Sequence, residues 1–334
     1  MKEKQEAIAA ALQAVPAGRF EIRRHAAPQS STQAPDAPLT VLTDGKGRIE
    51  RFAVFDGVEV SFHQYLAERV QFRHRADDSV LEIDHCRAGR IGWSMRGAAI
   101  YLGAGDVCLH TLDRCADSEM ILPLGFYEGI SVTVHPRQLQ AHCPEVLREA
   151  GFDVQAVCAK FSAGAAPVGL PASQTTEHIF APLYALPDAL RVPYYRLKAQ
   201  EILLYLSQLE PERAPGLSQY VSQQTELIKE IRDFLVQHLD QRFTIEALSK
   251  KYLINTSSLK AVFKAVYGLP IASYMKEYRV RQAMKLLRET DDSIAMIARK
   301  VGYETQGKFT KAFKEIAQIL PTEYRKFHGV SPDR

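Results

Sequence analysis

Two stretches near the C-terminus decide the fold: Thr256-Ser257-Ser258-Leu259-Lys260-Ala261-Val262-Phe263-Lys264 and Thr305-Gln306-Gly307-Lys308-Phe309-Thr310-Lys311-Ala312-Phe313-Lys314. Their apolar residues recur at helical spacing, so one stripe can be buried while the opposite face stays polar. We assign Phe263, Phe309 and Phe313 to the buried stripe rather than to base stacking. A short predicted helix and a tight turn precede each stretch. The last third of the chain therefore holds two similar units of helix, turn and helix.

Start and stop signals mark both units. Thr244 and Ser293 are predicted N-caps of the two short helices, because a hydroxyl oxygen at this position accepts a backbone N–H hydrogen bond. Gly268 is predicted to end the second helix of the first unit, and Gly302 lies in the turn of the second unit. Between the units, residues 273–288 are long enough to form a rigid spacer helix.

The half of the chain before residue 135 shows strand periodicity instead. Between Leu39 and Val134, apolar residues alternate in short runs such as Val58-Val60-Phe62 and Ile91-Trp93-Met95, with glycine and aspartate between the runs. Many short strands at this spacing indicate a β-sandwich or a small barrel. We expect a β-barrel.

Helical patterns follow the strands, over residues 138–150, 173–184 and 193–209. Two uses remain open for the apolar face of the helix at 193–209: packing onto its own barrel, or a subunit interface. A polar, proline-punctuated stretch at 211–216 is the predicted main boundary. We therefore predict an α+β multidomain protein with a β-barrel over 1–160, a helical linker and dimerisation segment over 161–215, and an all-α domain with two helix-turn-helix units over 222–330.

Charge is divided unevenly along the chain. The 334 residues carry a net charge of +3, but residues 222–334 contain 20 Lys and Arg against 13 Asp and Glu, a net of +7, which leaves −4 for the rest. Such a basic segment suits a polyanionic partner. The sequence has no export signal and no long apolar run, and its five cysteines are scattered. These features predict a cytoplasmic protein with no membrane partner.

The outward faces of the two predicted second helices have the chemistry of DNA recognition. An α-helix about 10 to 12 Å wide fits the major groove. Lysine neutralises phosphates, and glutamine, serine and threonine form hydrogen bonds with bases or backbone. Any one of Lys260, Lys308 and Lys311 could be an ordinary solvated side chain, but two matched units favour DNA contact.

These features resemble the C-terminal DNA-binding domain of the AraC/XylS family of bacterial transcription regulators. The resemblance covers about a hundred residues, and its motifs are Ile245-x-x-Leu-Ser249, Leu259-x-x-x-Phe-Lys264, Gly268, Tyr278-Arg279-x-x-x-Ala283-x-x-Leu-Leu287, Ile294-x-x-Ile-Ala298, Val301-Gly302-Tyr303, Phe309-x-x-x-Phe-Lys314 and Pro321-x-x-Tyr-Arg325. One departure is Gln318, which stands where the family usually has glycine, so this helix end must close in another way.

The resemblance implies double-stranded DNA and RNA polymerase as partners, a cupin-like N-terminal barrel that binds a small effector, and a homodimer. The family's base-facing positions, with the adjacent outward residues, give the predicted DNA-contact set: Ser257, Lys260, Ala261, Lys264, Thr305, Gln306, Gly307, Lys308 and Lys311. Ala261 and Gly307 offer no polar side-chain atom for direct base readout.

Candidates for effector binding in the barrel are His63, Tyr65, Trp93, Tyr101 and His110. Trp93 fits a core position as well as a pocket wall. A metal site formed by His85, Cys86, Cys108 and His110 is conceivable, since Cys108 and His110 share one face of a strand. The usual His-x-His and Glu cluster of cupin enzymes is absent, however, so we predict no metal, no cofactor and no enzymatic activity.

Two other functions compete with an effector-modulated regulator. One is a DNA-tethered enzyme, either a cupin-type catalyst or an alkyl-DNA repair methyltransferase, but repair needs a zinc-held cysteine cluster that the sequence lacks. The other is a DNA binder without a ligand. Thermal shifts across a metabolite panel would distinguish this binder from a sensor.

Overall fold

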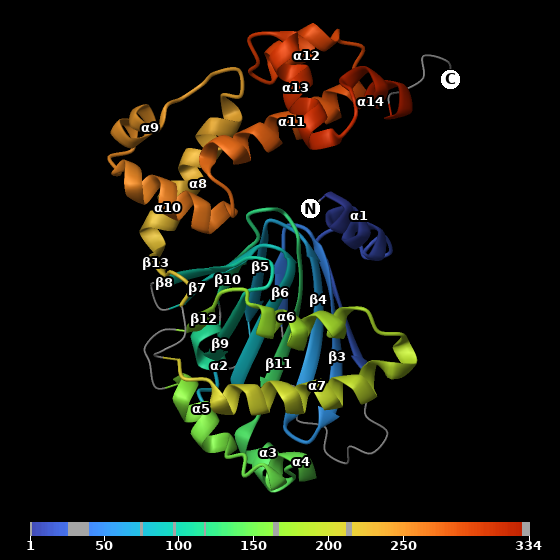
Figure 1. The fold of residues 1–334 in the computed structure, drawn as a ribbon, viewed down its shortest axis with the longest axis vertical. Helices are drawn as coiled ribbons and strands as arrows, with labels where there is room; N and C mark the ends of the chain where they lie inside the picture. Colours follow the sequence, from blue (N-terminus) through green and yellow to red (C-terminus); the bar gives the residue numbers. More distant parts are fainter. Residues whose placement is uncertain are drawn as a thin grey trace. The chain divides into compact units, whose positions relative to one another are not determined.

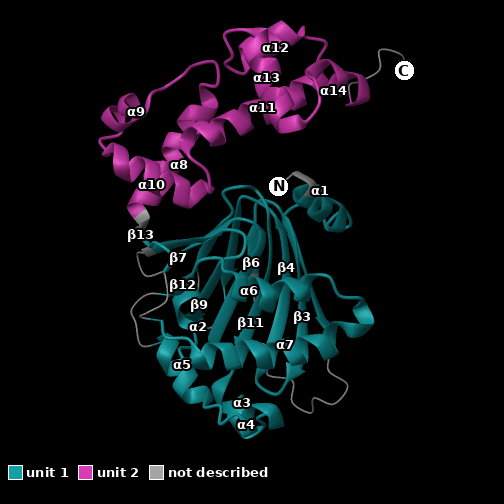
Figure 2. Cartoon of the chain, in the orientation of Figure 1, with its two compact units in different colours: residues 1–222 teal, residues 223–334 magenta. Residues whose placement is uncertain are grey.

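The computed structural model describes residues 2–25, 40–73, 76–95, 98–116, 118–162, 167–211 and 216–328. The chain divides into two compact units, Met1–Ser222 and Gln223–Arg334 (Figure 2). The first unit combines strands and helices, and the second is helical over its described residues (Figure 1). This confirms the predicted mixture of β and α structure and the helical C-terminal part. Most of the predicted boundary stretch 211–216, namely residues 212–215, lies outside the described ranges.

The strands of the first unit form two sheets. The seven-stranded sheet has the order β1-β3-β4-β11-β6-β9-β12, and the six-stranded sheet has the order β13-β8-β7-β10-β5-β2. The strands are β1 Arg19–His25, β2 Thr40–Thr43, β3 Lys46–Phe55, β4 Val58–Leu66, β5 Arg69–Arg73, β6 Leu81–Gly89, β7 Ile91–Met95, β8 Ala98–Leu102, β9 Val107–Thr111, β10 Glu119–Ile121, β11 Tyr127–Val134, β12 Val168–Leu170 and β13 Tyr220–Val221. Among the described residues the sheets do not close into a barrel, so the cupin-like barrel remains a prediction.

The two sheets share one core between their inner faces. Ile49 and Tyr127 of the seven-stranded sheet belong to the same buried cluster as Phe72, Trp93 and Ile100 of the six-stranded sheet. Side chains alternate between the two faces of a strand. Every second residue of the central strands therefore points into the space between the sheets, which is where an internal site can form.

Helices cover the outer face of the seven-stranded sheet (Figure 1). They are α3 Pro136–Ala141, α4 Glu145–Glu149, α5 Val154–Ser162, α6 Gln174–Phe180, the 3₁₀ helix η1 Ala181–Tyr184 and α7 Asp188–Gln208. Helix α7 buries Tyr195, Ile202 and Leu203 in this second core. Two short helices complete the unit: α1 Lys2–Ala11, and α2 Leu112–Cys115 directly after β9.

Two sequence predictions were wrong in this helical layer. The single helix expected over 138–150 is broken into α3 and α4 at Pro144, which is the N-cap of α4 and forces extended backbone. Helix α7 starts at Asp188 rather than Pro193, because Pro187 occupies the N-cap and Pro193 is accommodated inside the helix.

The second unit contains α8 Ser222–Gln237, α9 Ile245–Lys251, α10 Thr256–Tyr267, α11 Ile271–Glu289, α12 Ile294–Lys300, α13 Gln306–Ala317 and α14 Pro321–His328. The predicted caps are confirmed: Thr244 Oγ1 accepts a hydrogen bond from the Ala247 amide at 3.1 Å, and Ser293 Oγ accepts one from the Met296 amide at 3.2 Å. None of the helices among the described residues is long and apolar enough to cross a membrane.

Helix α11 is shared by both helix-turn-helix units. Its first half contacts α10, where the Tyr274 ring lies 5.5 Å from Phe263 and 4.8 Å from Tyr267. Its second half contributes Ala283 and Leu287 to the core formed with α12, α13 and α14. One straight element therefore carries both units.

The turns of the two units use the left-handed backbone region at matching points. Gly302 has φ 81°, and Leu253 has φ 53° in the first unit. Gly302 is also closely packed, since a Cβ atom placed there would lie 2.0 Å from the Leu239 carbonyl oxygen. Leu253 is 94% exposed. The departure from the family at Gln318 is resolved in the same way, because Gln318 adopts φ 61° and closes α13 through its amide and Lys314 O at 2.9 Å.

We predict opposite effects of substitution at these two turns. Gly302→Ala should destabilise the C-terminal unit by roughly 1–3 kcal/mol, because it adds a strained conformation and a clash with Leu239. Leu253→Gly should be neutral or stabilise by up to about 1 kcal/mol, because it removes left-handed strain at an exposed site. The measurement is urea unfolding of the full chain followed by circular dichroism in the helical region.

Trp93 provides an internal control for this experiment, since it is the only tryptophan and lies in the N-terminal unit. Its fluorescence transition should not move in either variant. Equal destabilisation by Gly302→Ala and Leu253→Gly would show that the left-handed turn is not the determining feature.

Candidate nucleic-acid interface

All nine predicted DNA-contact positions lie on the exposed side of the second unit. They fall on α10 and α13 or at the N-cap of α13, and each is exposed. The apolar stripe behind them is buried, with Phe263, Phe309 and Phe313 fully enclosed. The structure therefore separates a packed face from a solvent-facing polar face on both helices.

The first recognition helix, α10, is fixed at its N-terminus by a cap that the sequence analysis missed. Asn255 is the N-cap, and its Oδ1 accepts a hydrogen bond from the Ser258 amide at 2.7 Å. Ser249 Oγ also donates to Ile254 O at 2.6 Å, which holds the turn against α9. The side chains of Lys260 and Lys264 consequently project from a rigid helix.

The second recognition helix, α13, starts at Thr305. Thr305 Oγ1 accepts a hydrogen bond from the Lys308 amide at 3.3 Å, so this hydroxyl group is already used as a cap. Lys308 Nζ pairs with Glu304 at 2.6 Å, and this pairing lowers the pKa of Glu304. A Cβ atom at Gly307 would meet nothing within 4 Å. The first turn of α13 is thus open, and one of its lysines is partly neutralised.

The exposed faces suit a phosphate-rich partner. Among the described residues, no ion pair joins Lys260, Lys264 or Lys311 to a carboxylate. These ammonium groups can replace the counterions of a DNA backbone, and the positive ends of the α10 and α13 dipoles add to the attraction.

The effector candidates of the N-terminal unit lie on both faces of its sheets. His63, Tyr65 and His110 lie on the inner face of the seven-stranded sheet, and Trp93 lies opposite, with its ring 6.3 Å from that of His110. Tyr101 pairs with Gly92, the neighbour of Trp93, so it points to the other face of the six-stranded sheet. Four of the five candidates therefore face the core between the two sheets, and Tyr101 does not.

Two sets of polar contacts lie on this inner face, one at Asp84 and one at His63. Asp84 Oδ1 accepts a hydrogen bond from Ser131 Oγ at 2.5 Å, and its Oδ2 lies 2.9 Å from His110 Nε2. His63 Nδ1 contacts the hydroxyl group of Tyr65. Burial lowers the pKa of His63 to about 4, and its Nε2 is buried without a hydrogen-bond partner. Polar contacts therefore occupy the middle of an otherwise apolar core.

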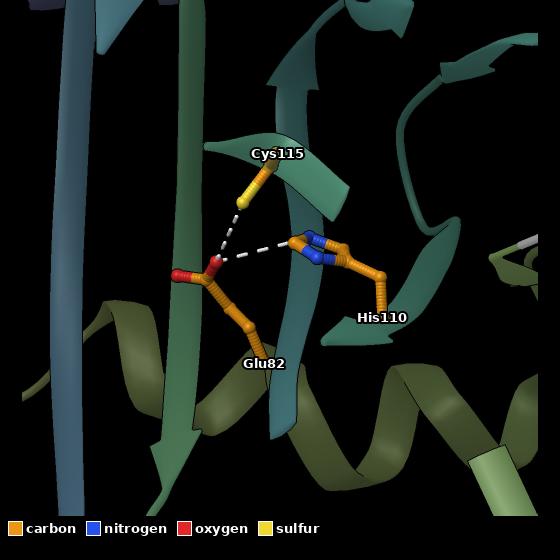
Figure 3. Close-up of side chains that lie close together, drawn as sticks. All are labelled: Glu82, His110 and Cys115. Atoms are coloured by element: carbon orange, nitrogen blue, oxygen red, sulfur yellow. Dashed lines mark hydrogen bonds and ion pairs between the residues drawn. The ribbon is translucent and has the colours of Figure 1, made fainter. Parts of the chain in front are cut away.

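The sequence analysis missed Asp84 in this inner site, and it also missed Glu82 and Cys115. The structure places Glu82 and Cys115 beside His110, with the three potential ligand atoms within 4.8 Å of one another (Figure 3). His85 and Cys86, which the sequence offered for a metal site, are not part of this group. Strand alternation in the sequence could have placed Glu82 on the same face as Asp84. The sequence does not show, however, that this strand pairs with the strand that carries His110.

Comparisons with known proteins agree on the C-terminal unit. A sequence profile described as a helix-turn-helix domain matches residues 248–326. The HTH-type transcriptional activator RhaR of Mannheimia succiniciproducens is 33% identical over 91 residues, which cover 27% of this chain and 33% of that protein. The arabinose operon regulatory protein of Escherichia coli is 29% identical over 99 residues, covering 29% of this chain and 34% of that protein.

A shorter relative is covered over most of its length. The transposon Tn10 TetD protein of Escherichia coli is 31% identical over 102 residues, which cover 30% of this chain and 74% of that protein. These matches, together with the two helix-turn-helix units that α11 joins, identify the class as helix-turn-helix DNA-binding proteins. The chain belongs to the AraC/XylS family of helix-turn-helix regulators. The chain spans only about a third of the length of the first two relatives, and each match covers less than a third of this chain.

We predict that Lys311→Ala weakens DNA binding and lowers the slope of log affinity against log salt by about 0.9, the contribution of one phosphate contact. Lys308→Ala should cost less, because Lys308 must leave Glu304 to reach DNA, and Glu304→Gln should strengthen binding. The measurement is DNA affinity over a salt series, with thermal unfolding in parallel.

Lys285→Ala is the matched control, since Lys285 is equally exposed but lies on α11. It should leave both the affinity and the salt slope unchanged. A large loss of folding stability in Lys311→Ala would contradict the assignment of this side chain to DNA contact.

Proposed function

We propose that this protein is a sequence-specific DNA-binding transcription regulator. The observation that supports it most strongly is the presence of two N-capped amphipathic helices, α10 and α13, with exposed polar faces and a common support in α11. A lone helix of this kind would be weak support. Two such helices, with matching turns before them and matching Phe-Lys pairs, suit contacts with two successive stretches of the major groove.

Base readout in this proposal comes from a small set of side chains. Ser257 and Gln306 can form hydrogen bonds with base edges, whereas Lys260, Lys264, Lys308 and Lys311 contact phosphates or guanine. Ala261 and Gly307 permit close approach of the helices to the groove, since neither has a long side chain and the space around Gly307 is open. Contact with RNA polymerase follows from the family and remains part of the proposal.

The N-terminal unit is proposed to bind a small effector between its two sheets. Support comes from the inner-face contacts of Asp84 with Ser131 and of His63 with Tyr65, and from the buried Trp93 Nε1, which has no hydrogen-bond partner. Buried polar atoms without partners are unusual in a folded core and are commonly satisfied by a ligand or water. An effector acts on DNA binding only if its affinity differs between two states of the chain.

We predict that selection of genomic fragments by the purified protein recovers one motif with two contact blocks about one helical turn, or 34 Å, apart. Lys260→Ala should weaken preference in one block, and Gln306→Ala should weaken it in the other, because the two residues lie on different recognition helices. Sequencing of selected fragments at low and raised salt measures both effects.

Recovery of unrelated fragments that disappear at raised salt would contradict sequence-specific binding, because it would show phosphate attraction alone. Loss of both blocks in a single variant would contradict the assignment of one block to each helix.

A homodimer formed through α7 is the second part of the proposal. Leu197 of α7 is 65% exposed although the helix buries its opposite face in the sheet core. Leu197 lines a surface groove with Val146, Ile179 and Tyr205 from the same helical layer. Exposed apolar side chains around a groove suit a self-complementary contact, and two-fold symmetry suits paired DNA sites.

We predict that Leu197→Asp converts a dimer into a monomer, because it places a charge in the proposed apolar contact. Leu190→Asp is the matched control: Leu190 is 54% exposed on the same helix but is not part of the groove lining. Light scattering coupled to size exclusion gives the mass of each variant. A monomeric parent protein, or equal behaviour of the two variants, would contradict the interface.

A further inference from the structure

Three side chains with metal-binding chemistry meet on the inner side of the seven-stranded sheet. Glu82 comes from β6, His110 from the neighbouring strand β9, and Cys115 from the end of α2 (Figure 3). Glu82 Oε2 lies 3.7 Å from His110 Nε2 and 4.0 Å from Cys115 Sγ. The residues are brought together by strand register, since Glu82 and His110 are direct cross-strand partners, and by the immediate start of α2 after β9.

We propose that Glu82, His110 and Cys115 bind a divalent transition-metal ion of the zinc class. A carboxylate oxygen, an imidazole nitrogen and a thiolate sulfur together form a donor set that zinc accepts. A tetrahedral ion with bonds of about 2.0 to 2.3 Å holds its ligand atoms roughly 3.3 to 3.7 Å apart. The Glu82–His110 separation lies at the upper end of this range, the Glu82–Cys115 separation exceeds it by a few tenths of an ångström, and the third pair lies within 4.8 Å.

One ring nitrogen of His110, Nδ1, makes the kind of backbone contact that metal-bound histidines make. This atom lies 3.2 Å from the Thr111 carbonyl oxygen, so Nδ1–H donates to the backbone and Nε2 is directed toward the carboxylates. Metal-bound histidines commonly use their second nitrogen in this way. Nε2 then faces Asp84 Oδ2 at 2.9 Å as well as Glu82. Such a position needs either a proton or a cation on the nitrogen, and metal binding replaces the proton.

The charge around the three residues also favours a cation. Glu82 and Asp84 project from the same face of β6 into the core. The Asp84 side chain is buried, and the Glu82 side chain is partly buried, with 20% of its area exposed. Two carboxylates in a protein interior are destabilising unless they are paired or bind a metal. A divalent ion held by Glu82, with Asp84 next to it, would offset this penalty.

The three ligands leave a fourth coordination position, and partners for a bound water or effector oxygen lie close by. Ser118 Oγ is buried without a hydrogen-bond partner, and its amide donates to Cys115 O at 3.0 Å. Trp93 Nε1 is likewise buried without a partner, and its ring neighbours His110. All of these residues lie in the N-terminal unit, so the site is independent of the proposed DNA contacts.

Cobalt provides the test, because a four-coordinate cobalt ion with a thiolate ligand gives strong visible bands and a near-ultraviolet charge-transfer band. Full-length protein, stripped with a chelator, should bind one Co²⁺ per chain with both features, and Zn²⁺ should displace it. Cys115→Ser should abolish the charge-transfer band. Cys143→Ser should retain it, since Cys143 is a partly exposed thiol outside the group.

A second variant guards against a folding defect in Cys115→Ser. Glu82→Gln preserves size and should weaken Zn²⁺ binding beyond the roughly 10- to 100-fold effect of losing an outer-shell partner. Zn²⁺ should raise the unfolding temperature of the parent protein, and Glu82→Gln should lose this shift. Failure of the parent protein to bind stoichiometric Co²⁺, an unchanged charge-transfer band in Cys115→Ser, or an undiminished Zn²⁺ shift in Glu82→Gln would overturn the proposal.

Discussion

The continuous packing of α11 into two separate cores is the constraint on which the C-terminal unit depends. Its early residue Tyr274 packs against the first helix-turn-helix unit, and Ala283 and Leu287 are buried with the second. A helix of 19 residues is about 28 Å long, close to one turn of DNA. Because one helix carries both units, the spacing between the recognition helices follows from core packing rather than from the DNA-facing residues.

Contacts outside α11 make the same frame more rigid. Arg279 donates to Gln241 O at 2.7 Å, and the neighbouring Leu239 carbonyl lies against Gly302. At the other end, Arg325 of α14 donates to Asp292 O at 2.5 Å, which ties the last helix to the start of the second unit. Two motif positions that looked like family markers in the sequence, Arg279 and Arg325, therefore act by joining segments.

The sequence predicted the C-terminal unit well because its signals are local. Caps such as Thr244, the apolar stripe and the turn glycine each depend on residues a few positions away. The N-terminal site depends on strand register, which the sequence does not contain. Trp93 is placed opposite Ile100 in the sheet, so Tyr101 falls on the other face. The proximity of Cys115 to Glu82 and His110 could be recognised only from the structure, because it depends on the pairing of β9 with β6 and on the start of α2 directly after β9.

The two compact units also differ in where their charged side chains lie: they are exposed on α10 and α13 of the C-terminal unit and buried or partly buried between the sheets of the N-terminal unit. The exposed lysines of α10 and α13 contribute little to folding, so the DNA-facing surface can be charged without a loss of stability. In the N-terminal unit, Asp84 and His110 are buried and Glu82 is partly buried between two sheets, where apolar side chains of similar size would stabilise the fold more simply. Two carboxylates and a histidine in contact within a core lower the stability of the fold, and the proposed binding role would account for their presence. These buried groups lie in the space between the sheets rather than at the sheet edges or in the loops, and this is where we propose that an effector or a metal ion binds.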